Sequence, residues 1–224
     1  MSAPLTRPQI AWRVAQDIAD GSYVNLGIGM PVMVADYLPE DREVVFHSEN
    51  GLLGMGPAPP AGDEDPELIN AGKQPVTLLT GGSYFHHTDS FVMVRGGHID
   101  LCVMGAYQVS SAGELANWAT DDDGYPPAVG GAMDLAAGAR RIFVMMEHST
   151  RAGEAKILDA CTYPLTGAGV VDRVYTDLAV IEVAAEGLVV REMIEGLGFA
   201  ALEAKTQAPL RLANDWRPLA APAL

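Results

Sequence analysis

Residues 44–57 read Val44-Val45-Phe46-His47-Ser48-Glu49-Asn50-Gly51-Leu52-Leu53-Gly54-Met55-Gly56-Pro57. The apolar run at 43–46 predicts a buried strand. Residues 48–51 are typical of a turn, because Asn-Gly adopts positive φ at little cost. The glycines that follow allow close approach of a ligand or of another backbone segment. The stretch therefore predicts Glu49 at the carboxyl end of a core strand, where it either faces a substrate or simply caps a turn.

Helical and strand patterns alternate upstream of this stretch. A capping-box pattern at 6–9, followed by apolar residues spaced by four, predicts a helix that ends near Gly21. A strand at 23–26, a glycine-rich turn at 27–29 and a helix at 31–38 are expected next. This alternation predicts an α/β fold with an open, mostly parallel or mixed sheet and helices on both faces. Ligands in such sheets bind outside the carboxyl ends of the strands, which is where Glu49 falls.

The remainder of the chain continues the alternation. The patterns predict loops at 57–75 and 120–129, strands at 76–79, 99–104 and 142–146, helices at 90–94, 131–139 and 199–205, and hairpins at 107–118 and 178–193. No linker interrupts the sequence, so we expect a single domain over residues 1–224, with a frayed tail from about 215 onward.

Composition excludes several classes of protein. Hydrophobic residues make up 49% of the 224 residues and charged residues 19%, which indicates a globular chain. The net charge of −15 argues against a nucleic-acid partner and requires local or borrowed cations if the ligand is anionic. The two cysteines, Cys102 and Cys161, form no framework and fit a reducing compartment. We expect no signal peptide, no membrane span and a cytoplasmic location, because no long apolar run is present.

Common site motifs are not matched. Gly27-Ile28-Gly29 lacks the third glycine of a dinucleotide-binding turn, and Gly72-Lys73 lacks the rest of a phosphate-binding loop. No G-x-S-x-G motif of a hydrolase is present. The five histidines form no H-E-x-x-H motif or Cys/His cluster, so we expect no metal site.

Six further motifs, together with residues 48–57, resemble the beta subunit of the 3-oxoacid CoA-transferase family and occur in its order. They are Tyr23-Val-Asn-Leu-Gly-Ile-Gly-Met-Pro31, Ile69-Asn-Ala-Gly-Lys-Gln-Pro75, Arg95-Gly-Gly-His-Ile-Asp100, Leu115-Ala-Asn-Trp118, Gly130-Gly-Ala-Met-Asp134 and Tyr163-Pro-Leu-Thr-Gly167. The resemblance extends from about residue 6 to residue 212.

The resemblance implies a covalent role for Glu49. A glutamate of ordinary pKa, about 4.3, is ionised at neutral pH and needs no base to attack an acyl carbon. In the family's ping-pong reaction, Glu49 would attack the donor thioester to give a mixed anhydride. The released CoA thiolate would then convert the anhydride to a glutamyl-CoA thioester, and the acceptor acid would reverse these steps. No cofactor is expected, because the CoA thioester is itself a substrate.

The family pattern also implies roles for residues near the other motifs. Gly130, Gly131 and Ala132 would contact CoA and supply oxyanion donors, or they only form a tight helix start. Asn25 either donates to a substrate or thioester oxygen or secures the neighbouring turn. Lys73 either meets a CoA phosphate or a substrate carboxylate, or it is a solvated loop residue.

The resemblance leaves the acceptor acid open between two choices. Residues 84–90, 144–146 with His148, and 161–167 resemble family members that act on 3-oxoadipate, and residues 121–127 depart from the acetoacetate type. We therefore expect transfer from succinyl-CoA to 3-oxoadipate, with acetoacetate as the alternative. His86 and His87 either hold the second carboxylate of that acid or form a polar pair on a loop.

The family arrangement also implies a partner. Its alpha half is a separate or fused α/β domain, so we expect a hetero-oligomer of alpha and beta chains. Alone, this chain would be inactive and would expose an apolar face. Two other functions stay open: a non-catalytic, ligand-sensing member of the fold, and a thioesterase if water reaches Glu49.

Overall fold

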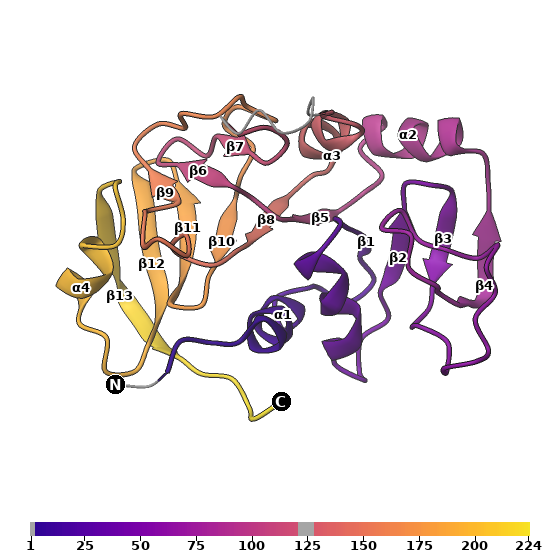
Figure 1. Ribbon diagram of the computed structural model, residues 1–224, viewed down its shortest axis with the longest axis horizontal. Coiled ribbons are helices and arrows are strands. Elements are labelled where there is room, and N and C mark those ends of the chain that lie inside the picture. Colours follow the sequence, from indigo (N-terminus) through magenta and orange to yellow (C-terminus); the bar gives the residue numbers. More distant parts are fainter. Residues whose placement is uncertain (1–2, 121–127) are drawn as a thin grey trace.

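The computed structural model describes residues 3–120 and 128–224, which form an α/β fold around a ten-stranded sheet (Figure 1). The strand order is β13-β12-β11-β10-β8-β5-β1-β2-β3-β4. These strands are β1 (Tyr23–Leu26), β2 (Val45–Ser48), β3 (Leu52–Met55), β4 (Leu78–Tyr84), β5 (Leu101–Met104), β8 (Ile142–Met145), β10 (Arg173–Tyr175), β11 (Ala179–Ala184), β12 (Gly187–Ile194) and β13 (Leu210–Leu219). The centre of the sheet, from β10 to β2, is parallel, and most neighbouring pairs beyond it are antiparallel.

The centre of the sheet contains a topological switch point. β2 follows β1 on one side, whereas β5 and β8 extend the sheet on the other side. A crevice therefore opens outside the carboxyl ends of β1 and β5, where open α/β sheets bind ligands. Asn25 on β1 lies opposite His47 on β2 and Cys102 on β5, so the side chains of these three residues share one face of the sheet.

Helices cover both faces of the sheet, which confirms the predicted fold class. They are α1 (Arg7–Ala15), the 3₁₀ helix η1 (Met30–Tyr37), α2 (His87–Arg95), α3 (Ala132–Gly138) and α4 (Phe199–Glu203). α1 contacts η1, and α2 contacts α3. Figure 1 shows α2 and α3 above the sheet and α1 below it. The predicted helix at 31–38 is thus a 3₁₀ helix, which begins after Gly29 at a φ of 89°.

A second, three-stranded sheet lies on the same side as α3 (Figure 1). Its order is β7 (Leu115–Ala116), β6 (Gln108–Ser110) and β9 (Ile157–Leu158). β6 and β7 form the hairpin predicted at 107–118. The Trp118 indole N–H donates to the carbonyl of Leu165 at 3.2 Å, which ties the end of this hairpin to the following loop. This small sheet stands beside the carboxyl ends of β5 and β8 and adds a wall to the crevice.

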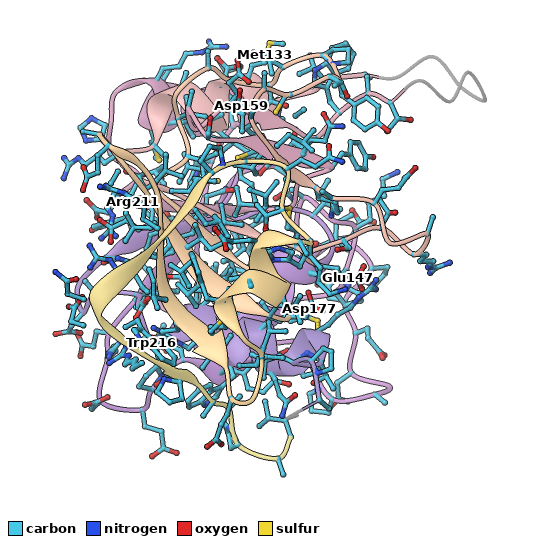
Figure 2. All side chains as sticks on the ribbon, turned by 90° about the vertical axis from the view of Figure 1, so that its left-hand side faces the viewer. Met133, Glu147, Asp159, Asp177, Arg211 and Trp216 are labelled. Carbon is cyan, nitrogen blue, oxygen red and sulfur yellow. The ribbon has the colours of Figure 1, made fainter. Side chains whose placement is uncertain are left out.

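The predicted frayed tail is wrong for residues 215–219. These residues belong to β13, which pairs in parallel with β12, and Leu219 is buried. Figure 2 shows Arg211 and Trp216 along this edge strand, and Trp216 remains 40% exposed. Pro218 and the alanines after it hid the strand in the sequence, because proline is tolerated at a sheet edge but is not typical of a strand.

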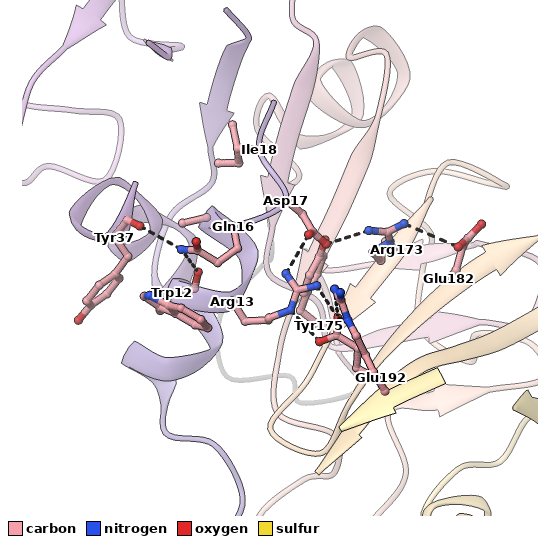
Figure 3. Close-up of polar contacts among 12 residues, drawn as sticks. Trp12, Arg13, Gln16, Asp17, Ile18, Tyr37, Arg173, Tyr175, Glu182 and Glu192 are labelled. Carbon is pink, nitrogen blue, oxygen red and sulfur yellow. Dashed lines mark hydrogen bonds and ion pairs between the residues drawn. The ribbon is translucent and has the colours of Figure 1, made fainter. Parts of the chain in front are cut away.

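A buried polar network joins α1 to the far part of the sheet (Figure 3). Arg13 donates to both carboxylate oxygens of Glu192 at 2.7 Å and pairs with Asp17 at 2.9 Å. Arg217 also donates to Glu192, at 2.8 Å. Burial opposes ionisation of Glu192, but the bonds and charges of both arginines outweigh it and lower its pKa. The network therefore holds β12 and β13 against the first helix.

Removing Arg13 should destabilise the chain strongly, because Glu192 and Asp17 would each lose a buried partner. Loss of one partner of a buried ion pair costs about 3 kcal/mol or more, which lowers the Tm by about 6–12 °C for a chain of this size. Thermal unfolding of the Arg13→Ala variant measures this. The exposed pair of Arg95 and Asp134 supplies the control, and Arg95→Ala should leave the Tm nearly unchanged. Equal Tm values for the two variants would contradict the assignment.

Candidate functional site

Glu49 lies in the turn that joins β2 to β3. The two strands are antiparallel, with His47 opposite Leu53, so the predicted turn is the loop of a hairpin. The sequence pattern did not reveal β3, because its glycine interrupts the apolar run. Gly51 has a φ of 119°, and a Cβ there would collide with the carbonyl of Phe85. The turn therefore requires glycine at 51, and its shape places Glu49 just outside the carboxyl end of β2.

The crevice at the switch point is a cleft of about 610 Å³, and Glu49 lines it. Its walls come from the turn after β1, the segment after β5, the β6–β7 hairpin, the start of α3 and the end of β8. Residues that line it include Gly27, Ile28, Glu49, Tyr107, Gly130, Gly131, Ala132, Glu147 and Lys156. The cleft thus brings Glu49 together with the predicted 130–132 motif.

Asn25, on the neighbouring strand β1, contacts the side chain of Glu49. Its side chain is fully buried, and its amide Nδ2 lies 3.4 Å from Glu49 Oε2. The same nitrogen lies 3.2 Å from the carbonyl oxygen of His47 and 3.0 Å from His47 Nδ1. The structure therefore places Asn25 against the carboxylate rather than in the turn that follows β1.

Burial dominates the acidity of Glu49. Desolvation raises the pKa of its carboxyl above the ordinary value, while the bond from Asn25, a bond from its own backbone N–H and the charge of His87 act in the opposite direction. The expectation that Glu49 has an ordinary pKa is therefore wrong, because burial raises this pKa. The Glu49 carboxylate is therefore more basic than a solvated one.

The predicted 69–75 motif lies against the Glu49 turn but outside the cleft lining. Ser48 Oγ accepts from the Ala71 N–H at 2.9 Å, and Asn50 Nδ2 donates to the Ile69 carbonyl at 2.7 Å. Lys73 is exposed and has a φ of 62°, which is uncommon outside glycine. The motif therefore braces the turn, and the structure does not bring Lys73 into the Glu49 cleft.

Gly130, Gly131 and Ala132 surround the start of α3. Gly130 has a φ of 56°, and a Cβ at Gly131 would collide with the ring of Phe91. The Ala132 N–H donates to the carbonyl of Val129 at 3.2 Å, so this donor is already engaged. The start of α3 therefore requires small residues for steric reasons. Gly130, Gly131 and Ala132 also line the cleft.

The two adjacent histidines have separate environments. His86 is the N-cap of α2, and its Nδ1 accepts from the Thr88 N–H at 3.1 Å. His87 packs edge-on against Phe91, and its charge acts on Glu49. His86 is therefore better described as a polar capping residue than as a contact for a substrate carboxylate. His87, in contrast, lies near Glu49.

Sequence reasoning missed Lys156 and His47. Lys156 is the one lysine or arginine among the described residues that line the cleft, and it directly precedes the apolar pair of β9. His47 is buried two residues before Glu49, on the same side of β2. β2 extends to Ser48, beyond the run predicted at 43–46, and its two-residue period places the side chain of His47 on the face toward Glu49.

The described residues contain no group of three or more His, Cys, Asp or Glu arranged to hold a metal. None of the helices over 3–120 and 128–224 is both long and apolar enough to cross a bilayer. The departure from the acetoacetate type at residues 121–127 lies outside the described residues.

Replacing Glu49 with glutamine should stabilise the chain at neutral pH. Because its pKa is raised on folding, the folded chain binds this proton more tightly than the unfolded chain, so stability falls as the pH rises through the folded pKa. Glu49→Gln should therefore have the higher Tm at pH 7.5, and the difference should vanish below the ordinary pKa of 4.5. The exposed residue Glu40 supplies the control, and Glu40→Gln should change the Tm at neither pH. A lower Tm for Glu49→Gln at pH 7.5 would contradict the burial of a charge at this position.

Comparison with known proteins gives consistent results. The family profile described as Coenzyme A transferase matches residues 7–201. The beta subunit of the 3-oxoadipate CoA-transferase of Acinetobacter baylyi is 60% identical over 206 residues, which are 92% of this chain and 95% of that protein. The protein of the same name from Pseudomonas putida is 61% identical over 206 residues, 92% of this chain and 96% of that protein. The beta subunit of the probable succinyl-CoA:3-ketoacid coenzyme A transferase of Bacillus subtilis is 48% identical over 209 residues, 93% and 96% of the two chains.

Solved structures share the fold. The acyl-CoA transferase YdiF of Escherichia coli O157:H7, in a thioester complex with CoA, has a TM-score of 0.73 at 17% identity and covers 97% of this chain and 43% of that one. The decarboxylase AibA/AibB has a TM-score of 0.67 at 17% identity and covers 97% and 89%. At this identity the likeness concerns the fold alone. Because the profile matches most of the chain and relatives of nearly full length are 48–61% identical, the chain belongs to the coenzyme A transferase family.

Proposed function

We propose that this chain is the beta subunit of a 3-oxoadipate CoA-transferase, which moves CoA from succinyl-CoA to 3-oxoadipate. The names of the relatives at 60% and 61% identity support this reaction. The observation that carries the proposal is the position of Glu49, a partly buried carboxylate that lines the cleft with an amide donor 3.4 Å away.

The proposed reaction needs only this carboxylate. A Glu49 oxygen attacks the thioester carbon of succinyl-CoA, the C–S bond breaks, and CoA leaves as the thiolate. The thiolate attacks the Glu49 carbonyl of the mixed anhydride, which releases succinate and leaves a glutamyl-CoA thioester. A carboxylate of 3-oxoadipate then attacks this thioester, and the same two steps run in reverse. No proton or electron is gained overall, so the route needs no cofactor or metal.

Asn25 is the proposed donor to the developing oxyanion. Each attack on the Glu49 carbonyl builds negative charge on a Glu49 oxygen, and Asn25 Nδ2 already points at Oε2. Gly130, Gly131 and Ala132 border the same cleft and are proposed to contact CoA and the acyl oxygen. Lys73 is proposed only as a contact for a CoA phosphate outside this cleft, since its turn is braced against the Glu49 turn.

Protection from water calls for a partner chain. The anhydride and the thioester both hydrolyse if water enters, yet the cleft is open in this chain alone. Two of the apolar residues that line it are exposed: Ile28 is 66% exposed and Tyr107 45%. The relatives are each named as one subunit of an enzyme, so we propose that an alpha subunit covers the cleft in a hetero-oligomer. Both cysteines are free thiols, which suits the cytoplasmic location included in the proposal.

Lys156 is the proposed contact for the far carboxylate of the acid. It is half-buried in the cleft lining and takes part in none of the ion pairs among the described residues, although the charges of Glu147 and Asp177 act on it. Glu147, which lines the same cleft, pairs instead with Arg7 at 2.8 Å. Succinyl and 3-oxoadipyl groups both carry a second carboxylate, whereas acetoacetate does not. A half-buried cation in a chain of net charge −15 therefore suits a dicarboxylic acid. His86 is not needed for this role, because it caps α2.

Glu49 should form a covalent adduct with CoA. Incubation of the complex of both subunits with succinyl-CoA should add the mass of CoA less one water to the peptide that contains Glu49, and borohydride reduction should release the CoA. Glu49→Ala should form no adduct and lose at least about 10⁴-fold in kcat, as expected for the loss of a nucleophile. The Glu40→Ala variant, which alters an exposed carboxylate, should form the adduct normally. Transfer at an undiminished rate by Glu49→Ala would overturn the proposal.

Lys156 should discriminate between acceptor acids. Because kcat/KM for one substrate of a ping-pong enzyme is independent of the other, each acid can be measured separately. Lys156→Met should lower kcat/KM for 3-oxoadipate about 10–100-fold, the range expected for a charge-assisted hydrogen bond, and should change that for acetoacetate by less than about threefold. The native complex should prefer 3-oxoadipate. A native preference for acetoacetate would overturn the assigned acid, and equal losses for both acids would overturn the role of Lys156.

A further inference from the structure

His47 is a buried histidine next to the site that the proposed reaction does not use. The residue is 1% exposed, and both ring nitrogens have partners. Nδ1 lies 3.0 Å from Asn25 Nδ2, and Nε2 lies 2.7 Å from Ser90 Oγ on α2. The ring also stacks on Phe85 at 6.2 Å between centroids. His47 therefore connects α2 to the amide that holds Glu49.

The contacts of Asn25 determine the tautomer of His47. Asn25 Nδ2 faces two groups that can only accept, the His47 carbonyl at 3.2 Å and Glu49 Oε2 at 3.4 Å. The thiol of Cys102 donates to Asn25 Oδ1 at 3.5 Å, which agrees with this orientation of the amide. His47 Nδ1 thus faces N–H donors and must accept, so the ring proton resides on Nε2 and is donated to Ser90.

The sheet register makes this arrangement rigid. Asn25 lies directly opposite His47 on β2 and opposite Cys102 on β5, so the three side chains form a row across neighbouring parallel strands. Glu49 follows His47 by two residues and so continues on the same face. Ser90 closes the row from α2 and is fully buried. Rotation of the Asn25 amide would break contacts with both neighbouring strands.

We propose that His47, held by Ser90, is a positioning residue whose Nδ1 lone pair fixes the Asn25 amide so that it donates to Glu49. The inference rests on the proposed function, because it assigns the amide a task in that reaction. The Asn25 amide has two N–H bonds and three acceptors within reach. His47 Nδ1 accepts one of these two N–H bonds and so fixes the orientation of the amide. Burial also lowers the pKa of His47 to about 4, so the lone pair stays free at neutral pH.

Two substitutions at His47 separate its two nitrogens. Asparagine can place an oxygen near the position of Nδ1, and glutamine can place an N–H near the position of Nε2. In the complex of both subunits, His47→Gln should lower kcat about 10–100-fold with KM for succinyl-CoA changed less than about twofold, whereas His47→Asn should stay within about fivefold of native. Because Asn25 favours the charged form of Glu49, His47→Gln should also move the acidic limb of kcat/KM to higher pH.

A double-mutant cycle tests whether His47 acts through Asn25. In an Asn25→Ala background, His47→Gln should cause no further loss of kcat. Ser90→Ala leaves the imidazole in place and should give a smaller loss that also disappears in that background, which keeps the test decisive if His47→Gln does not assemble. Nitrogen-15 NMR of histidine-labelled native complex should show His47 as the neutral tautomer protonated at Nε2.

Three results would overturn the inference: a ring protonated at Nδ1, an undiminished kcat in assembled His47→Gln, or equal losses from His47→Gln with and without Asn25. Each is distinct from failure of the proposed function, which would appear as the absence of a CoA adduct on Glu49 in the native complex.

Discussion

The contact between the Asn25 amide and the Glu49 carboxylate is the interaction on which the site depends. In the proposed reaction, Glu49 has to be shielded from water, since its acyl intermediates would hydrolyse, yet it also has to ionise to attack. Burial raises its pKa, and the amide 3.4 Å away opposes that shift and faces Oε2, where charge would build in the proposed reaction. One buried donor therefore opposes the rise in the pKa of Glu49, and in the proposed reaction it would also stabilise the oxyanion that develops there.

The fold supplies this contact through its strand order. The cleft opens at the switch point, where the chain adds β2 on one side of β1 and β5 on the other, and the parallel register of β1 and β2 places Asn25 opposite His47 and within reach of Glu49. The hairpin from β2 to β3 then turns Glu49 into the cleft, and the 69–75 turn braces it from the side. A decarboxylase shares this fold, so the chemistry follows from the side chains at the switch point rather than from the sheet itself.

Much of this arrangement could be predicted from the sequence. Alternating helix and strand patterns indicate where the strands lie, and ligands of such sheets bind outside the carboxyl ends of those strands. Glu49 and the 130–132 motif line the same cleft, and Asn25 lies beside the carboxylate. The short strands β9 and β10 were not predicted, because two or three residues are too few to show a period; β6 and β7 are equally short, but the turn between them revealed their hairpin. The position of Lys73 could not be predicted, because a motif in a loop does not indicate in which direction a side chain points. Lys156 comes from a distant segment that only the tertiary fold brings to the cleft.

The central claim is that an oxygen of Glu49 is exchanged between the two acids in a site closed to water. Turnover of 3-oxoadipate labelled with oxygen-18 in its carboxylates, by the complex of both subunits, tests this directly. Attack on the glutamyl-CoA thioester leaves one labelled oxygen on Glu49, and the next attack on succinyl-CoA passes it to succinate. We predict labelled succinate from labelled 3-oxoadipate and unlabelled succinate from labelled water. Label from water, or none from 3-oxoadipate, would contradict the claim.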